Sequence, residues 1–146
     1  MVARISSLVP SPFAGAPIFA RWQRRYRAQV SVNGKLVEIE WSRAAQHALA
    51  RRSSPLTLEL ELYLSCLVKK FVHFHETVPD HETVAVNDRL RLFFRAVTST
   101  ACSMERADQL GRQPEMELRG PVAQRLAPQR VWLDRRRGAW TAEYWL

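Results

Sequence analysis

Cysteine is scarce in this chain, and long hydrophobic runs are missing. The two cysteines among 146 residues, Cys66 and Cys102, are too few for a disulfide framework and favour a reducing compartment, so we expect a cytoplasmic protein. No run of about 18 apolar residues is present, which argues against a membrane-spanning helix and a membrane partner. The sequence also contains no catalytic or cofactor motif and no internal repeat. These absences favour a non-enzymatic protein that forms a single domain over residues 1–146.

Acidic residues are absent from the first 37 positions, although this stretch carries six cations. Residues 38–88 contain eight acids and five cations, whereas residues 89–146 contain eleven cations and six acids. The formal net charge of +8 favours an anionic partner, either nucleic acid or an acidic protein. We expect the binding surface to draw on both ends of the chain. The alternative is that the charge only keeps the chain soluble.

The first 20 residues are apolar and acid-free, but three prolines interrupt them, at Pro10, Pro12 and Pro17. Such an interrupted segment makes a poor signal-peptide core. It is compatible with a transit-like leader or with a stretch that packs against the fold.

Five leucines alternate with polar residues over Leu56–Leu64, which predicts a strand with one dry and one wet face. Continued to Glu76, this strand would be about 70 Å long, against about 40 Å for a compact domain of this size. We therefore expect a break within Ser65–Lys70. Cys66 continues the leucine parity, so we expect it to be buried. A second alternating run, Val84–Ala96, predicts a strand that pairs antiparallel to the first.

A tight turn is predicted at Asn33-Gly34, because both residues tolerate the positive φ that a type I′ hairpin requires. The resulting register makes one face apolar and pairs opposite charges on the other. It opposes Val30 to Val37, Ala28 to Ile39, Tyr26 to Trp41 and Arg27 to Glu40.

A second hairpin is predicted at the C-terminus, with Arg135–Gly138 as a four-residue loop and Leu133 opposite Trp140. Trp132 and Trp140 then lie on opposite faces. Ser42 is a good N-cap for a helix over Arg43–Arg52. A further helix is expected from about Thr100 to Leu110, and Met116 and Leu118 fit a short strand. Together these elements predict an α+β fold, with a largely antiparallel sheet of five to six strands and two to three short helices.

Arginines beside aromatic residues form the main candidate site. Arginine binds phosphate through two parallel hydrogen bonds, and aromatic rings stack on bases. One group surrounds Trp22, one follows the strand with Phe93, and one occupies the last hairpin. No nucleic-acid-binding signature is present, so the alternative is a solvated arginine rim around aromatic core residues. The candidate binding residues are Arg21, Trp22, Arg24, Arg25, Arg27, Arg89, Arg91, Arg95, Arg135, Arg136 and Arg137.

Three of the four histidines lie close together in the sequence, at His73, His75 and His81. His73 and His75 share a strand face because they are two residues apart. With His81 they form a candidate site for Zn or Fe, although the spacing matches no known ligand motif. The alternative is a polar hairpin tip. We therefore predict a basic binding or accessory module without a cofactor, and the alternative is a metalloprotein or metalloenzyme built on these three histidines.

Overall fold

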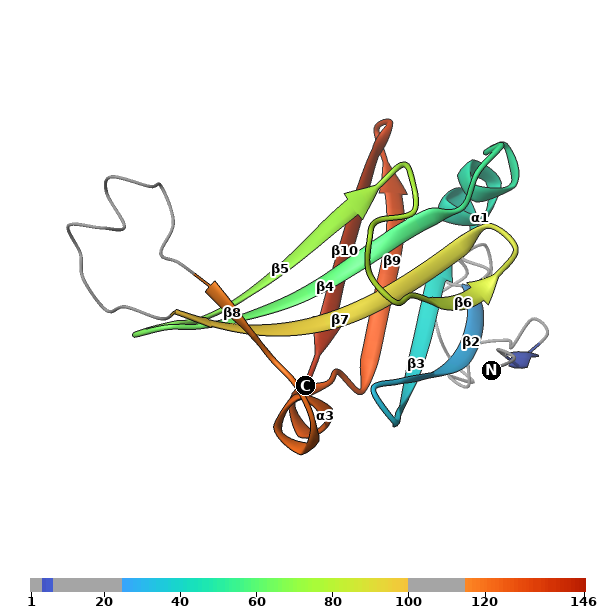
Figure 1. The fold of residues 1–146 in the computed structure, drawn as a ribbon. Coiled ribbons are helices and arrows are strands. Elements are labelled where there is room, and N and C mark those ends of the chain that lie inside the picture. The colour runs from blue at the N-terminus through green and yellow to red at the C-terminus, as the bar shows by residue number, and fades with distance from the viewer. Residues whose placement is uncertain (1–3, 7–24, 100–114) are drawn as a thin grey trace, which may run out of the picture.

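The structure is a computed structural model that describes residues 4–6, 25–99 and 115–146. These residues form two five-stranded sheets and two helices (Figure 1). The elements are β1 (Arg4–Ser6), β2 (Arg25–Val32), β3 (Lys35–Ser42), α1 (Arg43–Ala50), β4 (Leu56–Leu64), β5 (Val68–His75), β6 (Val84–Asn87), β7 (Leu90–Ser99), β8 (Glu115–Leu118), α3 (Pro121–Leu126), β9 (Arg130–Arg136) and β10 (Ala139–Trp145).

Sheet A has the strand order β1-β2-β3-β9-β10, in which only the β3–β9 pair is parallel. The turn between β2 and β3 has φ of 51° at Asn33 and 79° at Gly34, as a type I′ hairpin requires. Every residue pair predicted for this hairpin is confirmed, including Arg27 opposite Glu40. The register is set locally, because the turn and the two strand faces all favour it.

Sheet B has the strand order β5-β4-β7-β6, and β8 pairs with the far end of β7. The predicted single sheet is corrected to two mixed sheets, in which most strand pairs are antiparallel but β4 and β7, predicted to be antiparallel, pair in parallel. The α+β class is confirmed in its broad sense. The predicted strand Val84–Ala96 is in fact two strands, β6 and β7. The chain reverses between them where the Asn87 side chain accepts a hydrogen bond from the Arg89 backbone N–H at 2.8 Å.

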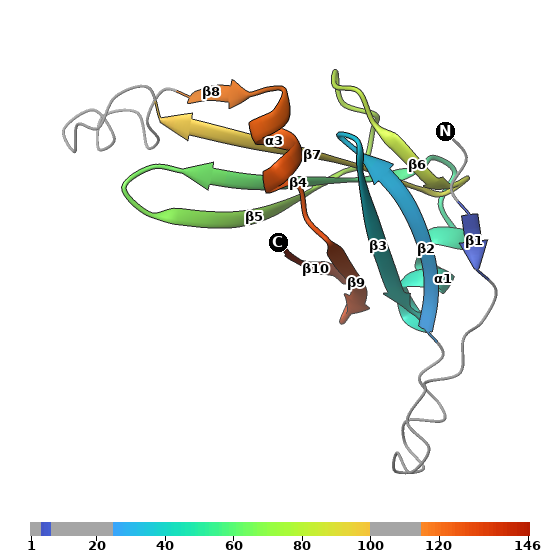
Figure 2. The same cartoon turned by 90° about the horizontal axis from the view of Figure 1, so that it is seen from below.

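The hydrophobic core lies between the two sheets, whose strands cross one another (Figures 1 and 2). Leu56, Leu58, Leu60 and Leu62 of β4 are at most 1% exposed and Leu64 at the strand end is partly buried, so the alternation did identify the dry face. Tyr144 of β10 crosses this core, and its hydroxyl donates a hydrogen bond to the Glu61 carbonyl. Burial and the negative charge of Glu61 raise the pKa of Tyr144.

The helices connect the sheets at opposite ends. Ser42 caps α1 as predicted, accepting a hydrogen bond from the Ala45 N–H at 3.1 Å, and the helix ends at Ala50. The helix α3, which was not predicted, begins with Pro121 in its first turn and lies where the chain passes from β8 to β9 (Figure 2). Among the described residues, no helix has the length and apolar character needed to cross a membrane.

Two local predictions are corrected. Cys66 is exposed, because the chain leaves the strand at Ser65 and the leucine parity stops there. The last turn contains only Arg137 and Gly138, both at positive φ, so Trp140 faces Arg135 rather than Leu133. The short strand around Met116 is confirmed as β8. The helix expected from Thr100 to Leu110 lies outside the described residues.

Candidate functional site

The outward face of sheet B is covered by its own chain. Because β5 and β6 occupy opposite edges of the sheet, residues 76–83 must cross over β4 and β7 to connect them (Figure 1). His81 on this crossing segment stacks on Phe93 of β7 with a centroid separation of 4.3 Å. The polar residues of β4 on this face are buried as well: Glu61 is 1% and Glu59 9% exposed, and both contact side chains of the neighbouring strands β5 and β7. The two carboxylates are consequently shielded from water.

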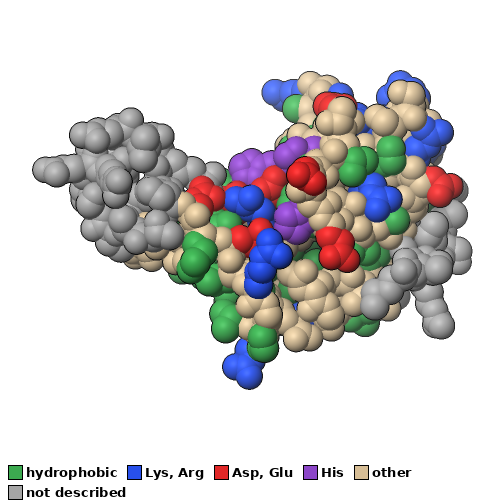
Figure 3. All heavy atoms as spheres, in the orientation of Figure 1, with side chains coloured by type: hydrophobic (Ala, Val, Ile, Leu, Met, Phe, Trp, Pro, Cys, Tyr) green, Lys and Arg blue, Asp and Glu red, His purple; other side chains and the backbone are tan. Residues whose placement is uncertain are grey.

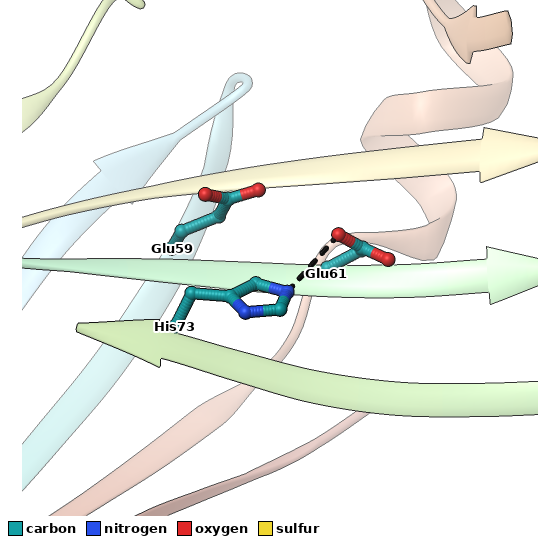
Figure 4. A group of neighbouring side chains, drawn as sticks. All are labelled: Glu59, Glu61 and His73. Carbon is teal, nitrogen blue, oxygen red and sulfur yellow. Dashed lines mark hydrogen bonds and ion pairs between the residues drawn. The ribbon is translucent and has the colours of Figure 1, made fainter. Parts of the chain in front are cut away.

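Two histidines of β5 face the two glutamates of β4. The Nε2 atom of His73 lies 3.2 Å from Glu61 Oε2, and Nε2 of His75 lies 2.6 Å from Glu59 Oε2. Figure 4 shows the His73 ring reaching across from β5 toward the carboxylates on β4. We call Glu59, Glu61, His73 and His75 the Glu–His cluster.

Arg95 of β7 joins the Glu–His cluster from the other side. Its guanidinium lies 3.3 Å from Glu59, 3.8 Å from Glu61 and 2.9 Å from Glu115 of β8. Its Nε atom has no well-formed hydrogen bond, and neither has the hydroxyl of Thr57, which is fully buried on the same face. Arg95 therefore serves as a structural counter-ion here, which leaves it poorly placed to contact an external anion.

His81 has a different carboxylate partner from the other two histidines. Its Nε2 lies 3.0 Å from Glu117 Oε1, and its Nδ1 lies 2.9 Å from the Glu82 carbonyl. Burial lowers the pKa of His81, but the hydrogen bonds to Glu117 and Glu82 and the charge of Glu117 outweigh that effect and raise it above the ordinary value. A protonated ring satisfies both acceptors, because each nitrogen then donates.

A second polar region lies on sheet A. Each of the three tryptophans in the last hairpin has an arginine guanidinium close to its ring. The guanidinium carbon of Arg25 lies 5.1 Å from the Trp132 ring centre, that of Arg130 lies 4.6 Å from Trp145, and that of Arg135 lies 4.7 Å from Trp140. These distances are typical of cation–π contacts. We call these six residues the arginine–tryptophan surface. Trp132 and Trp140 lie on opposite faces of sheet A, as predicted.

The remaining predicted arginines have local partners. Arg27 pairs with Glu40 at 2.9 Å, and Arg91 donates to the Thr83 hydroxyl at 2.8 Å. Arg89 donates to the Arg52 carbonyl. Arg91, Phe93 and Arg95 share one face of β7, but Arg89, which we expected on the same face, precedes the strand. Arg21, Trp22 and Arg24 lie outside the described residues.

The tip of the last hairpin is only partly neutralised. Arg136 pairs with Asp134 at 2.7 Å. Burial raises the pKa of Asp134, but hydrogen bonds from Ser42, Arg136 and the Arg135 N–H, with the charge of Arg136, lower it overall. In the part of the chain that the structure describes, no carboxylate forms an ion pair with Arg130, Arg135 or Arg137.

The arginine–tryptophan surface adjoins a cavity of about 310 Å³ beside α1. Sequence reasoning missed Arg51 and Arg52, which follow the end of α1 and line this cavity. It also missed Glu59 and Glu61, although both lie on the predicted wet face of β4. The turn that joins β4 to β5 was the available signal, because it sets which glutamate faces which histidine. The cavity is lined by Ala48, Arg51, Arg52, Glu76, Arg135 and Trp140.

A comparison with models of known families, with curated proteins and with solved structures finds no match to this chain.

Proposed function

We propose that this chain is a non-enzymatic module that binds single-stranded nucleic acid through the arginine–tryptophan surface. The observation that carries the proposal is the pairing of Trp132, Trp140 and Trp145 with one guanidinium each, at 4.6–5.1 Å. Flat indole rings stack on bases of any sequence, while arginines reach the phosphates that flank a stacked base. Trp132 and Trp145 share the outward face of sheet A, where a flexible, unpaired strand could stack on both rings, while Trp140 lies on the other face and lines the cavity beside α1.

The charge around the last hairpin supports an anionic ligand. Figure 3 shows Lys and Arg side chains gathered at the end of the molecule that carries α1 and the β9–β10 turn. The 310 Å³ cavity at this end brings Arg51 and Arg135 to one opening with the Trp140 ring. A phosphate group there would find bidentate donors and an aromatic wall together.

The ion pairs of sheet A narrow the set of residues that contribute. Arg27 is held by Glu38 and by Glu40 at 2.9 Å, so it adds little to phosphate binding, whereas Arg25 contacts Glu40 only at 3.9 Å and its side chain is 57% exposed. We therefore assign the binding to Arg25, Arg130, Arg135 and Arg137 among the predicted arginines and their neighbours. Such a module would act in the cytoplasm, in keeping with the two cysteines.

The test is a fluorescence titration of the full chain with labelled single-stranded RNA and DNA at several salt concentrations. We expect the triple variant Arg130→Ala, Arg135→Ala, Arg137→Ala to weaken binding and to reduce the salt slope by about 2, since each lost contact to a single strand removes roughly 0.7. Arg27→Ala is the matched control and should bind like the wild type. Binding to polyglutamate in place of RNA would favour an acidic protein partner, and no salt-sensitive binding to any polyanion would refute the proposal.

A further inference from the structure

We infer that Glu59, Glu61 and His73 form a binding site for one divalent transition-metal ion, and that His75 positions Glu59. Of the three histidines predicted from the sequence as metal ligands, only His73 is a ligand in this site. The inference is independent of the proposed nucleic-acid binding.

The donor atoms are close to a metal-binding arrangement. The Glu59, Glu61 and His73 ligand atoms all lie within 4.8 Å of one another (Figure 4). Neighbouring ligands around a tetrahedral ion with bonds of about 2.0–2.1 Å lie about 3.3 Å apart. The 3.2 Å separation between His73 Nε2 and Glu61 Oε2 matches that value. A small movement of the Glu59 carboxylate would bring the third ligand into place.

The surroundings supply the other parts of a metal site. His75 Nε2 lies 2.6 Å from Glu59 Oε2, so it can orient this carboxylate as outer histidines and carboxylates do in known sites. The fully buried Thr57 hydroxyl has no hydrogen-bond partner and lies on the same face, opposite His75. Three protein ligands leave a fourth position open for water.

Arg95 does not block the site. Its guanidinium is already shared with Glu115 at 2.9 Å, so it remains paired when an ion takes Glu59 and Glu61. A metal ion can reach the site from the side of His73, whose side chain is 41% exposed. The Glu61 side chain behind it is only 2% exposed. Imidazole and carboxylate ligands without sulfur suit Zn²⁺, Mn²⁺ or Fe²⁺.

The experiment is isothermal titration of the chelator-treated full chain with ZnCl₂, repeated with MnCl₂. We expect about one equivalent to bind. His73→Gln and Glu59→Gln should weaken binding at least tenfold, and His75→Gln should weaken it by roughly 10- to 100-fold. The matched controls are Glu38→Gln on sheet A and His47→Gln on α1, which should bind as the wild type does.

Two further measurements keep the test decisive. Histidine-ring NMR of the unaltered chain should show His73 signals shifting on addition of Zn²⁺, with His81 and His47 unaffected, and this requires no variant to fold. His81→Gln should retain the metal. Loss of binding in His81→Gln with retention in Glu59→Gln would overturn the site in favour of three histidines. No binding of either ion would overturn it altogether, whatever the nucleic-acid titration shows.

Discussion

The outward faces of the two sheets begin from the same sequence pattern and end in different environments. Glu38 and Glu40 alternate with apolar residues on β3, as Glu59 and Glu61 do on β4. On sheet A, Glu38 keeps 33% of its side chain exposed and pairs with Arg27 near the surface. On sheet B, the Glu61 side chain is 2% exposed. Alternation therefore determines which way a side chain points, but what packs over that face determines whether water reaches it.

A carboxylate–arginine ion pair should therefore contribute more to the stability of the fold on sheet B than on sheet A. An ion pair open to water contributes little, because water replaces the lost partner. A carboxylate buried on sheet B has no such replacement. The following changes test this difference, beginning with the one expected to be largest.

Replacement of Arg95 by Met should destabilise the protein by about 3–5 kcal/mol, since it leaves Glu59 and Glu61 buried without their shared guanidinium. Arg27→Met on sheet A is the matched control and should cost less than about 1 kcal/mol. Urea unfolding of both variants measures the contrast. Equal losses would mean that the two faces do not differ in the way described.

Gly34→Val should cost about 1–3 kcal/mol, because it places a β-branched residue at a φ of 79°. A Cβ there would also lie 2.8 Å from the Gln124 side-chain nitrogen. Leu67→Val in the β4–β5 turn, where the side chain is exposed, should change stability by less than about 0.5 kcal/mol. Thermal unfolding compares the two, and an unchanged melting temperature in Gly34→Val would show that sheet A does not depend on this turn.

Glu117→Gln should destabilise the protein in acid but not in base. The raised pKa of His81 means that its ion pair stabilises the fold fully below about pH 6.5 and loses this contribution as the pH rises through the folded-state pKa. We expect a loss of about 1 kcal/mol at pH 5.5 and almost none at pH 9. Unfolding at the two pH values, with an NMR titration of His81, provides the measurement. A loss that is the same at both values would contradict the assignment.

Thr57→Val should stabilise the metal-free protein slightly, by about 0.5–1 kcal/mol, because it removes a buried hydroxyl that lacks a hydrogen-bond partner. Thr141→Val on the exposed side of β10 should be neutral within about 0.5 kcal/mol. Destabilisation by Thr57→Val in chelator-treated protein would indicate that water satisfies the buried hydroxyl in the metal-free protein.

The sequence could predict the structural features that depend on neighbouring residues. Asn33-Gly34 specified its own turn and register. The reversal at Asn87–Arg89 was hidden because Val86 and Leu90 are both even-numbered, so the alternation passes through the turn without a break. Nothing local indicates that β4 lies parallel to β7.

The candidate sites also contain features that the sequence could predict and features that it could not. The arginines of the last hairpin were evident from composition, although the register was two residues off because Arg137 itself takes a positive φ. The contacts of His73 with Glu61 and of His75 with Glu59 depend on the β4–β5 register, which the sequence analysis did not assign. His81 required the path of residues 76–83, which follows only from the strand order.

The parallel pairing of β3 with β9 has a consequence for synthesis of the chain. The two strands are joined by a segment that contains all of sheet B, so one edge of β3 stays unpaired during synthesis until β9 has been made. Exposed strand edges promote association with other chains. The last hairpin therefore protects the nascent protein as well as supplying the arginine–tryptophan surface. A chain interrupted before Arg130 would lose that surface and be prone to aggregation.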